Sequence, residues 1–237
     1  MHTQKDRLTP LLGLVTGLVF LLSSYFIWNS PPDKNQGDLV RMMYIHVPTA
    51  WIAYLSFGMT AFWGLGYLLK FDRKFDRLSM ASTEIGVVMT FLAIVGGMLW
   101  ARPTFGVYWV WEPRLTTTAL MFLVFIGYFI VRGLIEDPHR RAQVSAVIGI
   151  VGSLSIPINY MSVAWWNSLH QGYTAQLLGK PQVFADTQMQ WALYSSTLAF
   201  TLLYVYFLRL RATLARRIDS QEERDLERER QFAQGGS

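Results

Sequence analysis

Residues 8–28 read LTPLLGLVTGLVFLLSSYFIW, a continuous run without a charged side chain. An α-helix of roughly 20 apolar residues crosses the hydrocarbon core of a bilayer, which is about 30 Å thick. Lys5 and Arg7 precede the run, as basic residues do in a signal peptide, but the apolar stretch is long and no small-x-small cleavage site follows it. We therefore predict that residues 8–28 form an uncleaved membrane-spanning helix.

The rest of the chain repeats this pattern. Of its 237 residues, 52% are apolar and 16% are charged, so six such spans take up about half of the sequence and leave only short loops. The same runs could be buried helices of a water-soluble protein, but so little polar sequence could not cover six of them. The sequence predicts an all-α integral membrane protein with six transmembrane helices. The further spans are expected at residues 49–69, 80–100, 116–131, 144–164 and 190–208.

The basic residues are distributed unequally between the two sides of such a bundle. With the N-terminus inside, all but five of the 21 Lys and Arg residues are also inside, so both termini are expected to be cytoplasmic. We expect one six-helix domain over residues 1–208 and a charged cytoplasmic tail over residues 209–237. The tail mixes both charge signs from Asp219 to Arg230, which is typical of a solvated helix or a disordered segment. The five basic residues outside are Lys34, Arg41, Arg102, Arg114 and Lys180.

Composition excludes two other classes of function. The net charge of +5 comes from basic residues in short clusters between apolar runs, so we expect the lipid bilayer and no nucleic acid as a partner. The chain has no cysteine, which rules out a disulfide framework, a thiol redox pair and a thiolate metal site.

A dense group of aromatic residues lies between the third and fourth spans, where residues 100–116 read WARPTFGVYWVWEPRLT. Five of the twelve residues from Trp100 to Trp111 are aromatic, whereas the chain average is 15%. Trp and Tyr also gather at membrane interfaces without binding any ligand. Arg102 and Arg114 flank this group, however, and an aromatic surface bounded by guanidinium groups suits a flat, apolar, dianionic ligand such as a porphyrin.

Two of the four histidines are expected on the outer side, beside this loop. His46 lies at the outer end of the second span and His170 a few residues beyond the fifth, whereas His2 and His139 are inside. Two neutral imidazoles on opposite faces of a porphyrin would complete the coordination of haem iron. A cytochrome b-like electron carrier holds haem between its spans, whereas the six apolar runs here contain no histidine. The sequence therefore favours a surface haem site with His46 and His170 as axial ligands, Trp100, Tyr108, Trp109 and Trp111 as stacking surfaces, and Arg102 and Arg114 as partners of the propionates.

Glu112 is open to two interpretations. It precedes Pro113, where the fourth span begins, so it could place negative charge near that helix N-terminus or pair with Arg114. It could equally contact the ligand, and we include it among the candidate binding residues.

Three segments resemble cytochrome c maturation protein C, a six-span family of haem-handling proteins with a tryptophan-rich (WWD) periplasmic loop. They are MYIHVPTAW at residues 43–51, WVWEPRLT at 109–116, and SIPIN at 155–159 followed by SVAWWNSLHQ at 162–171. The spacing of the spans is also similar along nearly the whole chain. The sequence departs from the family where Phe105 and Tyr108 replace common Trp residues and where Glu112 replaces the usual Asp.

The resemblance implies a function and a site. Members of this family bind haem b on the periplasmic face of the bacterial inner membrane and promote its attachment to a haem chaperone, cytochrome c maturation protein E. They associate with an ABC transporter made of proteins A and B and with the small membrane protein D. Carried over by motif, His46 and His170 are the axial ligands, and Trp109 and Trp111 contribute to the haem platform. We expect the loop to hold the porphyrin flat with one edge uncovered for the chaperone, so the protein acts by positioning and has no activated nucleophile.

Two other functions stay open on the sequence alone. A permease would move haem or another small molecule through its own spans, and polar groups inside the membrane often mark such a path. Glu84 and Asn159 are the candidates, although Glu84 could pack between helices and Pro157 with Asn159 could merely bend the fifth span. The third function is a structural subunit with an adhesive outer surface, which the paired histidines disfavour.

Overall fold

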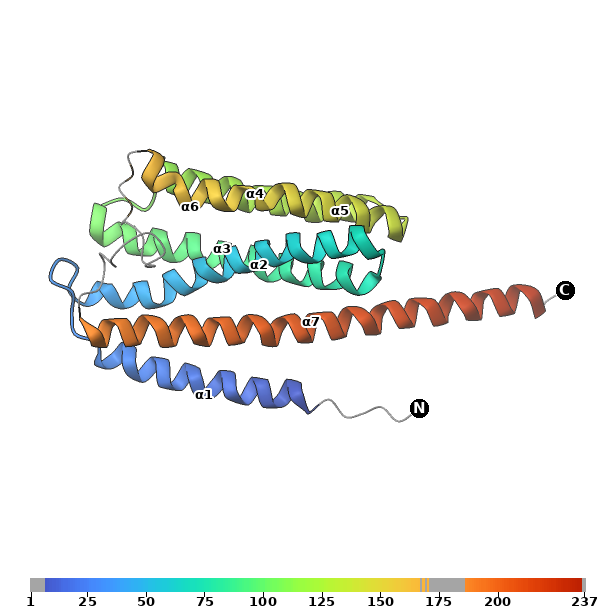
Figure 1. Ribbon diagram of the computed structural model, residues 1–237, viewed down its shortest axis with the longest axis horizontal. Coiled ribbons are helices and arrows are strands. Elements are labelled where there is room, and N and C mark those ends of the chain that lie inside the picture. Colours follow the sequence, from blue (N-terminus) through green and yellow to red (C-terminus); the bar gives the residue numbers. More distant parts are fainter. Residues whose placement is uncertain (1–6, 167, 169, 171–185, 236–237) are drawn as a thin grey trace.

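The computed structural model describes residues 7–166, 168, 170 and 186–235. These residues form long helices that run side by side (Figure 1). Six helical segments are long and apolar enough to cross a membrane, and they coincide with the six predicted spans. The prediction of an all-α, multi-span membrane protein is therefore confirmed. The helices are α1 (Leu8–Asn29), the 3-10 helix η1 (Asp38–Met42), α2 (Met43–Lys70), α3 (Arg73–Phe105), α4 (Pro113–Leu134), α5 (Pro138–Ser153), α6 (Ser155–Trp165) and α7 (Thr187–Gly235).

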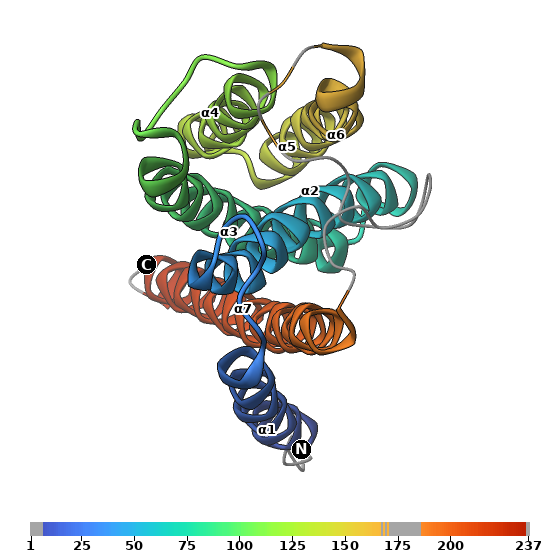
Figure 2. The same ribbon diagram turned by 90° about the vertical axis from the view of Figure 1, so that its left-hand side faces the viewer.

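Seen along the helix axes, α2 and α3 lie in the middle of the bundle (Figure 2). On one side of them α7 separates them from α1, and on the other side lie α4, α5 and α6. The start of α1 and the end of α7 lie at the same end of the bundle, which we call the terminal end (Figure 1). The opposite end, called the loop end, carries η1, the loop between α3 and α4, and the end of α6. His2, Lys5 and Lys180, which entered the sequence argument, lie outside the described residues.

The third span is longer than predicted because its helix continues into the tryptophan-rich stretch. The prediction covered residues 80–100, whereas α3 ends at Phe105. Gly106 ends the helix with φ at 78°, a left-handed conformation that favours glycine, and its N–H bonds to the carbonyl of Arg102 at 3.0 Å. Only residues 106–112 therefore connect α3 to α4.

The fifth span is divided at Leu154 into α5 and α6. Pro157 has no N–H, and its ring would clash with the carbonyl of Ser153, four residues earlier, so a straight helix cannot continue there. The hydroxyl of Ser155 donates to the carbonyl of Gly152 at 2.6 Å and stabilises the junction. The helix is thus interrupted at Leu154, three residues before Pro157.

A buried ion pair joins α3 to α4 near the terminal end. The guanidinium of Arg132 makes two hydrogen bonds to the carboxylate of Asp76, at 2.7 and 2.8 Å. Each side chain is only 12% exposed. Because neither charge has much access to water, each one depends on the other for its stabilisation.

The charged tail begins as a direct continuation of α7. Arg211 in α7 pairs with Glu84 in α3 at 2.6 Å, and Asp219 pairs with Arg77 at 2.8 Å. The helical alternative for the tail is therefore correct, and its first turns are packed against α3. Beyond them α7 runs past the other helices to Gly235 (Figure 1).

Candidate functional site

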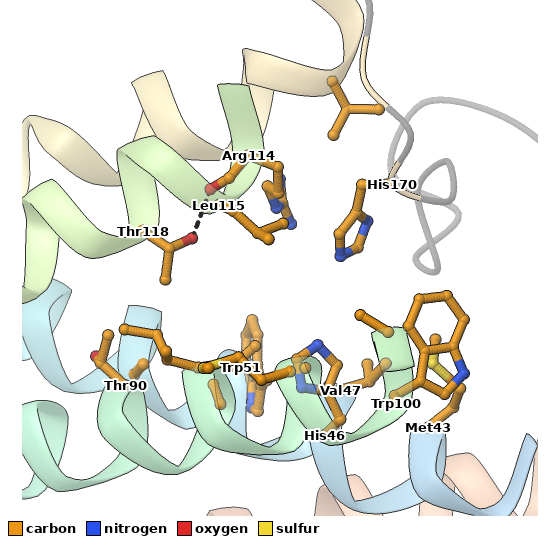
Figure 3. A pocket seen from close by; sticks show the side chains of 18 of the residues that line it. Met43, His46, Val47, Trp51, Thr90, Trp100, Arg114, Leu115, Thr118 and His170 are labelled. Atoms are coloured by element: carbon orange, nitrogen blue, oxygen red, sulfur yellow. Dashed lines mark hydrogen bonds between the residues drawn. The ribbon is translucent and has the colours of Figure 1, made fainter. Parts of the chain in front are cut away.

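A cavity of about 710 Å³ lies at the loop end, with walls from α2 and α3 on one side and from α4 and α6 on the other. Its volume falls within the range of about 300–1,000 Å³ that is typical of ligand pockets. The lining is mostly apolar and reaches along α3 from Trp100 to Thr90 (Figure 3). The candidate binding residues that line it are His46, Trp100, Trp109, Glu112, Arg114 and His170.

The first turns of α2 determine where His46 lies. Pro48 is inside this helix and has no N–H to donate to the carbonyl of Tyr44, four residues earlier. The hydroxyl of Ser196 in α7 donates a hydrogen bond to that carbonyl instead. The helix therefore remains intact around His46, and α7 holds its first turn in place.

The imidazole of His46 packs against α3. A Cβ atom added at Gly97 would lie 3.1 Å from Cε1 of the ring, so the close approach depends on glycine at this position. Nδ1 is buried and makes no hydrogen bond to the described residues.

His170 reaches the same cavity from a different part of the chain, five residues beyond the end of α6. Its backbone N–H donates to the Ser168 hydroxyl oxygen at 3.1 Å, and the Ser168 hydroxyl donates to the carboxylate of Glu112. Figure 3 shows the His170 ring entering the cavity from the wall opposite His46. The structure therefore brings the two candidate axial ligands together, on facing walls of one cavity.

Glu112 is the N-cap residue of α4 and is only 7% exposed. Its Oε1 accepts the backbone N–H of Leu115 at 2.9 Å, and its Oε2 accepts the hydroxyl of Ser168. Negative charge is thus placed at a helix N-terminus, as one of the two interpretations expected. The contact with Ser168 was not foreseen.

The tryptophans fall into two groups. Trp100 is buried, lines the cavity, and donates its indole N–H to the side chain of Gln36 at 3.1 Å. Trp109 also lines the cavity, and its indole nitrogen is buried with no hydrogen-bond partner among the described residues. Trp111 packs edge-on against Trp109, at 5.5 Å between ring centroids, but is 78% exposed and does not line the cavity.

The two arginines also differ in their surroundings. Arg114 lines the cavity from the first turn of α4, and its Nη1 donates to the backbone carbonyls of Asn159 and Tyr160 at 2.9 and 3.1 Å. Both contacts use the same nitrogen, whereas a guanidinium carries N–H donors on all three of its nitrogens. Arg102 lies outside the cavity lining, where it donates to the carbonyl of Gly106 and stands 5.6 Å from the ring centre of Tyr108. Tyr108 is likewise exposed and outside the lining.

A buried polar cluster supports Arg114 and was missed as part of the site. Asn159 in α6 is fully buried and accepts a hydrogen bond from the Tyr54 hydroxyl of α2. Its amide donates to the hydroxyls of Thr117 and Thr118 in α4, at 2.7 and 2.9 Å. The cluster therefore ties α2, α4 and α6 together beside Arg114. The one signal in the sequence was a polar residue within an apolar span, which we had attached to the permease alternative.

The residues around the cavity fit a flat, largely apolar ligand with a metal at its centre. Two imidazoles on facing walls can supply two axial nitrogens, as haem iron accepts from protein. Aromatic rings at the loop end can pack against a porphyrin, and the Arg114 guanidinium can bind a carboxylate.

A family model described as "Heme exporter protein C" matches residues 1–226 of the chain. The heme exporter protein C of Bradyrhizobium diazoefficiens is 36% identical over 84% of this chain and 75% of its own length. That of Escherichia coli is 33% identical, over 80% of this chain and 77% of its own. A Marchantia polymorpha protein described as a putative cytochrome c biosynthesis ccmC-like mitochondrial protein is 32% identical over 68% of both chains. With nearly its whole length matched, this chain belongs to the heme exporter protein C family, the family that its sequence motifs resemble.

Proposed function

We propose that this protein binds haem b in the cavity between His46 and His170 and delivers it to a haem chaperone during cytochrome c biogenesis. The observation that carries the proposal is the placement of these two imidazoles on facing walls of one aromatic-lined cavity. The names of the relatives, a heme exporter and a cytochrome c biosynthesis protein, support a role in haem handling.

The position of the two ligands indicates how the porphyrin would lie. In a haem with two axial histidines the ring plane is perpendicular to the line between the nitrogens. The ring would then stand between the wall of α2 and α3 and the wall of α4 and α6, with one edge at the mouth of the cavity. The sequence alone favours a porphyrin lying flat on the loop, with one edge uncovered. An exposed edge is common to both arrangements.

Other residues would fix the porphyrin within that plane. Trp100 and Trp109 would pack against the ring near the loop end, and Arg114 would pair with a propionate. Arg102, Tyr108 and Trp111 do not line the cavity, so we assign them contacts at its mouth, where they would shelter the exposed edge of the haem.

Delivery would proceed by positioning. The imidazole N–H of a histidine of the chaperone, cytochrome c maturation protein E, would add across a vinyl double bond at the exposed edge, with the nitrogen bonding to one vinyl carbon and the proton passing to the other as the π bond is lost. Holding that edge in place would make the encounter effectively unimolecular. The chain has no Gly-rich phosphate loop with a lysine, so ATP would be hydrolysed by another component. We assign that component to the ABC transporter of proteins A and B, and we include the small protein D in the complex, because the family resemblance implies both.

We place the loop end of the bundle on the periplasmic face of the bacterial inner membrane. All but five of the 21 basic residues would then lie on the cytoplasmic side, with both termini. The haem cavity and the chaperone would thereby meet in one compartment.

The permease alternative has less support. The two intramembrane polar residues that suggested it are both engaged between helices. Glu84 pairs with Arg211, and Asn159 bonds to Thr117, Thr118 and Tyr54. Neither residue therefore marks a polar path across the membrane.

The proposal is tested by purifying the chain from haem-replete bacteria that also produce the chaperone. We expect the chain to carry haem b, identified by its pyridine haemochrome spectrum, and the chaperone to carry covalent haem, identified by staining after denaturing electrophoresis. A variant with both His46→Ala and His170→Ala should lose both signals, whereas His139→Ala, at the terminal end, should keep them. Covalent haem on the chaperone at the wild-type level in the double variant would refute the proposal.

A further inference from the structure

We propose that Glu112 and Ser168 form a clasp that positions His170 for axial ligation of the iron. The clasp consists of the Glu112 carboxylate, the Ser168 hydroxyl and the backbone N–H of His170. The inference rests on the proposed function and deepens it, since it assigns the orientation of one axial ligand to residues that do not touch the iron.

The two axial ligands are held in different ways. His46 is part of α2, and its ring is confined by the backbone of α3 at Gly97. His170 lies five residues beyond the end of α6 and belongs to no described helix. The direction of its side chain therefore depends on contacts outside regular secondary structure, and the clasp supplies a contact to its own backbone N–H.

The hydrogen bonds of the clasp form a chain with a fixed direction. The His170 N–H donates to the Ser168 hydroxyl oxygen at 3.1 Å, and the Ser168 hydroxyl donates to Oε2 of Glu112. The acceptor at the end is a carboxylate, and a hydrogen bond to a charged acceptor is shorter and stronger than one between neutral groups. The carboxylate is itself anchored, because its Oε1 accepts the N–H of Leu115 at 2.9 Å. His170 is thus tied to the rigid start of α4.

Helix capping alone does not account for Glu112. Short side chains such as Ser, Thr, Asp and Asn are the ones preferred at the N-cap, because they reach the N–H groups of the first turn directly. Glutamate is one methylene longer than aspartate. In this structure the longer side chain uses one oxygen for the cap and the other for Ser168. With only 7% of Glu112 exposed, a carboxylate oxygen that lost its partner would have little water to replace it.

The test is a haem titration of the full-length chain in detergent, after haem depletion, followed by absorption and electron paramagnetic resonance spectroscopy. Ser168→Ala breaks the bridge but leaves the cap between Glu112 and Leu115. Ser168→Thr keeps the hydroxyl. Glu112→Gln keeps one acceptor oxygen for the cap and replaces the other by an amide group, which can donate to the Ser168 oxygen, so it removes the negative charge from the bridge while a neutral contact remains. Ser155→Ala is the matched control, since its hydroxyl bonds to Gly152 at the α5–α6 junction and lies outside the cavity lining.

We expect Ser168→Ala to raise the dissociation constant for haem about tenfold, the effect of losing one such hydrogen bond. Glu112→Gln should raise it less, because a neutral hydrogen bond to Ser168 replaces the charge-assisted one. Part of the low-spin signal should become high-spin because His170 no longer holds the sixth position. Added imidazole should restore the low-spin signal by filling that position. The signal is measured on haem that co-elutes with the folded chain in size-exclusion chromatography, because imidazole also makes free haem low-spin. Ser168→Thr and Ser155→Ala should keep the wild-type spectrum and affinity.

The outcomes separate this inference from the function on which it rests. If the wild type shows a bis-histidine spectrum and Ser168→Ala and Glu112→Gln show the same spectrum and affinity, the clasp is overturned while the proposed function stands. The clasp is also overturned if imidazole fails to restore the low-spin signal in a Ser168→Ala variant that elutes as a folded protein in size-exclusion chromatography. A wild-type chain that binds no haem overturns both.

Discussion

The imidazole of His46 lies against the backbone of α3 at Gly97, where a Cβ atom would come within 3.1 Å of ring carbon Cε1. A contact this short requires one partner to move by a few tenths of an ångström, and the partner that faces the backbone here is the ring of the proposed ligand. The orientation of the first candidate ligand thus depends on the absence of a side chain on a neighbouring helix.

Substitution of Gly97 is therefore expected to disturb haem binding. Gly97→Val should push the His46 ring away from α3 and lower haem retention several-fold, and Gly97→Ala should have a smaller effect in the same direction. Gly127→Ala in α4 is the control, because nothing lies within 4 Å of its added Cβ. The ratio of haem absorbance to protein in the purified variants measures the effect. Wild-type haem content in Gly97→Val would show that this contact does not orient His46.

The two loop tryptophans should contribute unequally. Trp109 lines the cavity, whereas Trp111 is 78% exposed and touches Trp109 from outside. Loss of an aromatic stacking partner costs about 0.5–1.5 kcal/mol beyond its buried area, so Trp109→Ala should weaken haem binding by about tenfold. Trp111→Ala should weaken it less. Haem affinities measured by titration test this order. Unchanged affinity in both variants would indicate that the two tryptophans lie at the membrane interface without binding the ligand.

Arg114 should recognise the propionates of haem. We expect the wild type to bind haem more tightly than haem dimethyl ester, whose carboxylates are blocked, and Arg114→Gln to lose most of this preference. Arg102→Gln, which alters an exposed guanidinium outside the cavity lining, should keep more of it. Competition titrations with the two porphyrins give the ratio directly. A preference that survives in Arg114→Gln would mean that another group binds the propionates.

The buried pair of Asp76 and Arg132 should affect stability and leave the haem site unchanged. Asp76→Ala leaves the Arg132 guanidinium without its partner at a position only 12% exposed, and breaking a buried pair in this way costs about 3–5 kcal/mol. We expect a lower midpoint of thermal unfolding in detergent and an unchanged haem spectrum at low temperature. Arg228→Ala, which breaks an exposed pair with Asp225, is the control and should shift the midpoint little. Equal midpoints for Asp76→Ala and wild type would contradict this account.

The spans could be predicted because apolar length alone determines which segments can cross a membrane. Their ends could not, since helical hydrogen bonds continue where hydrophobicity stops. Arg102 and Pro103 are unfavourable inside the hydrocarbon core of a membrane, yet α3 includes both and ends only at Gly106. The break at Leu154 could be expected from Pro157, because a missing N–H and a ring clash are local effects.

The site was predictable where it depends on topology and not where it depends on packing. Counting spans places His46 and His170 at the same end of the bundle, and the structure places both in one cavity. Counting cannot show which of the neighbouring loop aromatics faces the cavity, because residues 106–112 have no regular periodicity. The contact between Glu112 and Ser168 joins segments 56 residues apart, and no local pattern marks it.

The most direct test of the central claim is the spin state of the iron in haem-loaded protein, measured by electron paramagnetic resonance. We predict a low-spin, bis-histidine signal for the wild type. His46→Ala and His170→Ala should each convert it to high-spin, and added imidazole should restore the low-spin signal in each. If both variants kept the wild-type low-spin signal without imidazole, these two residues would not be the axial ligands and the account would be wrong.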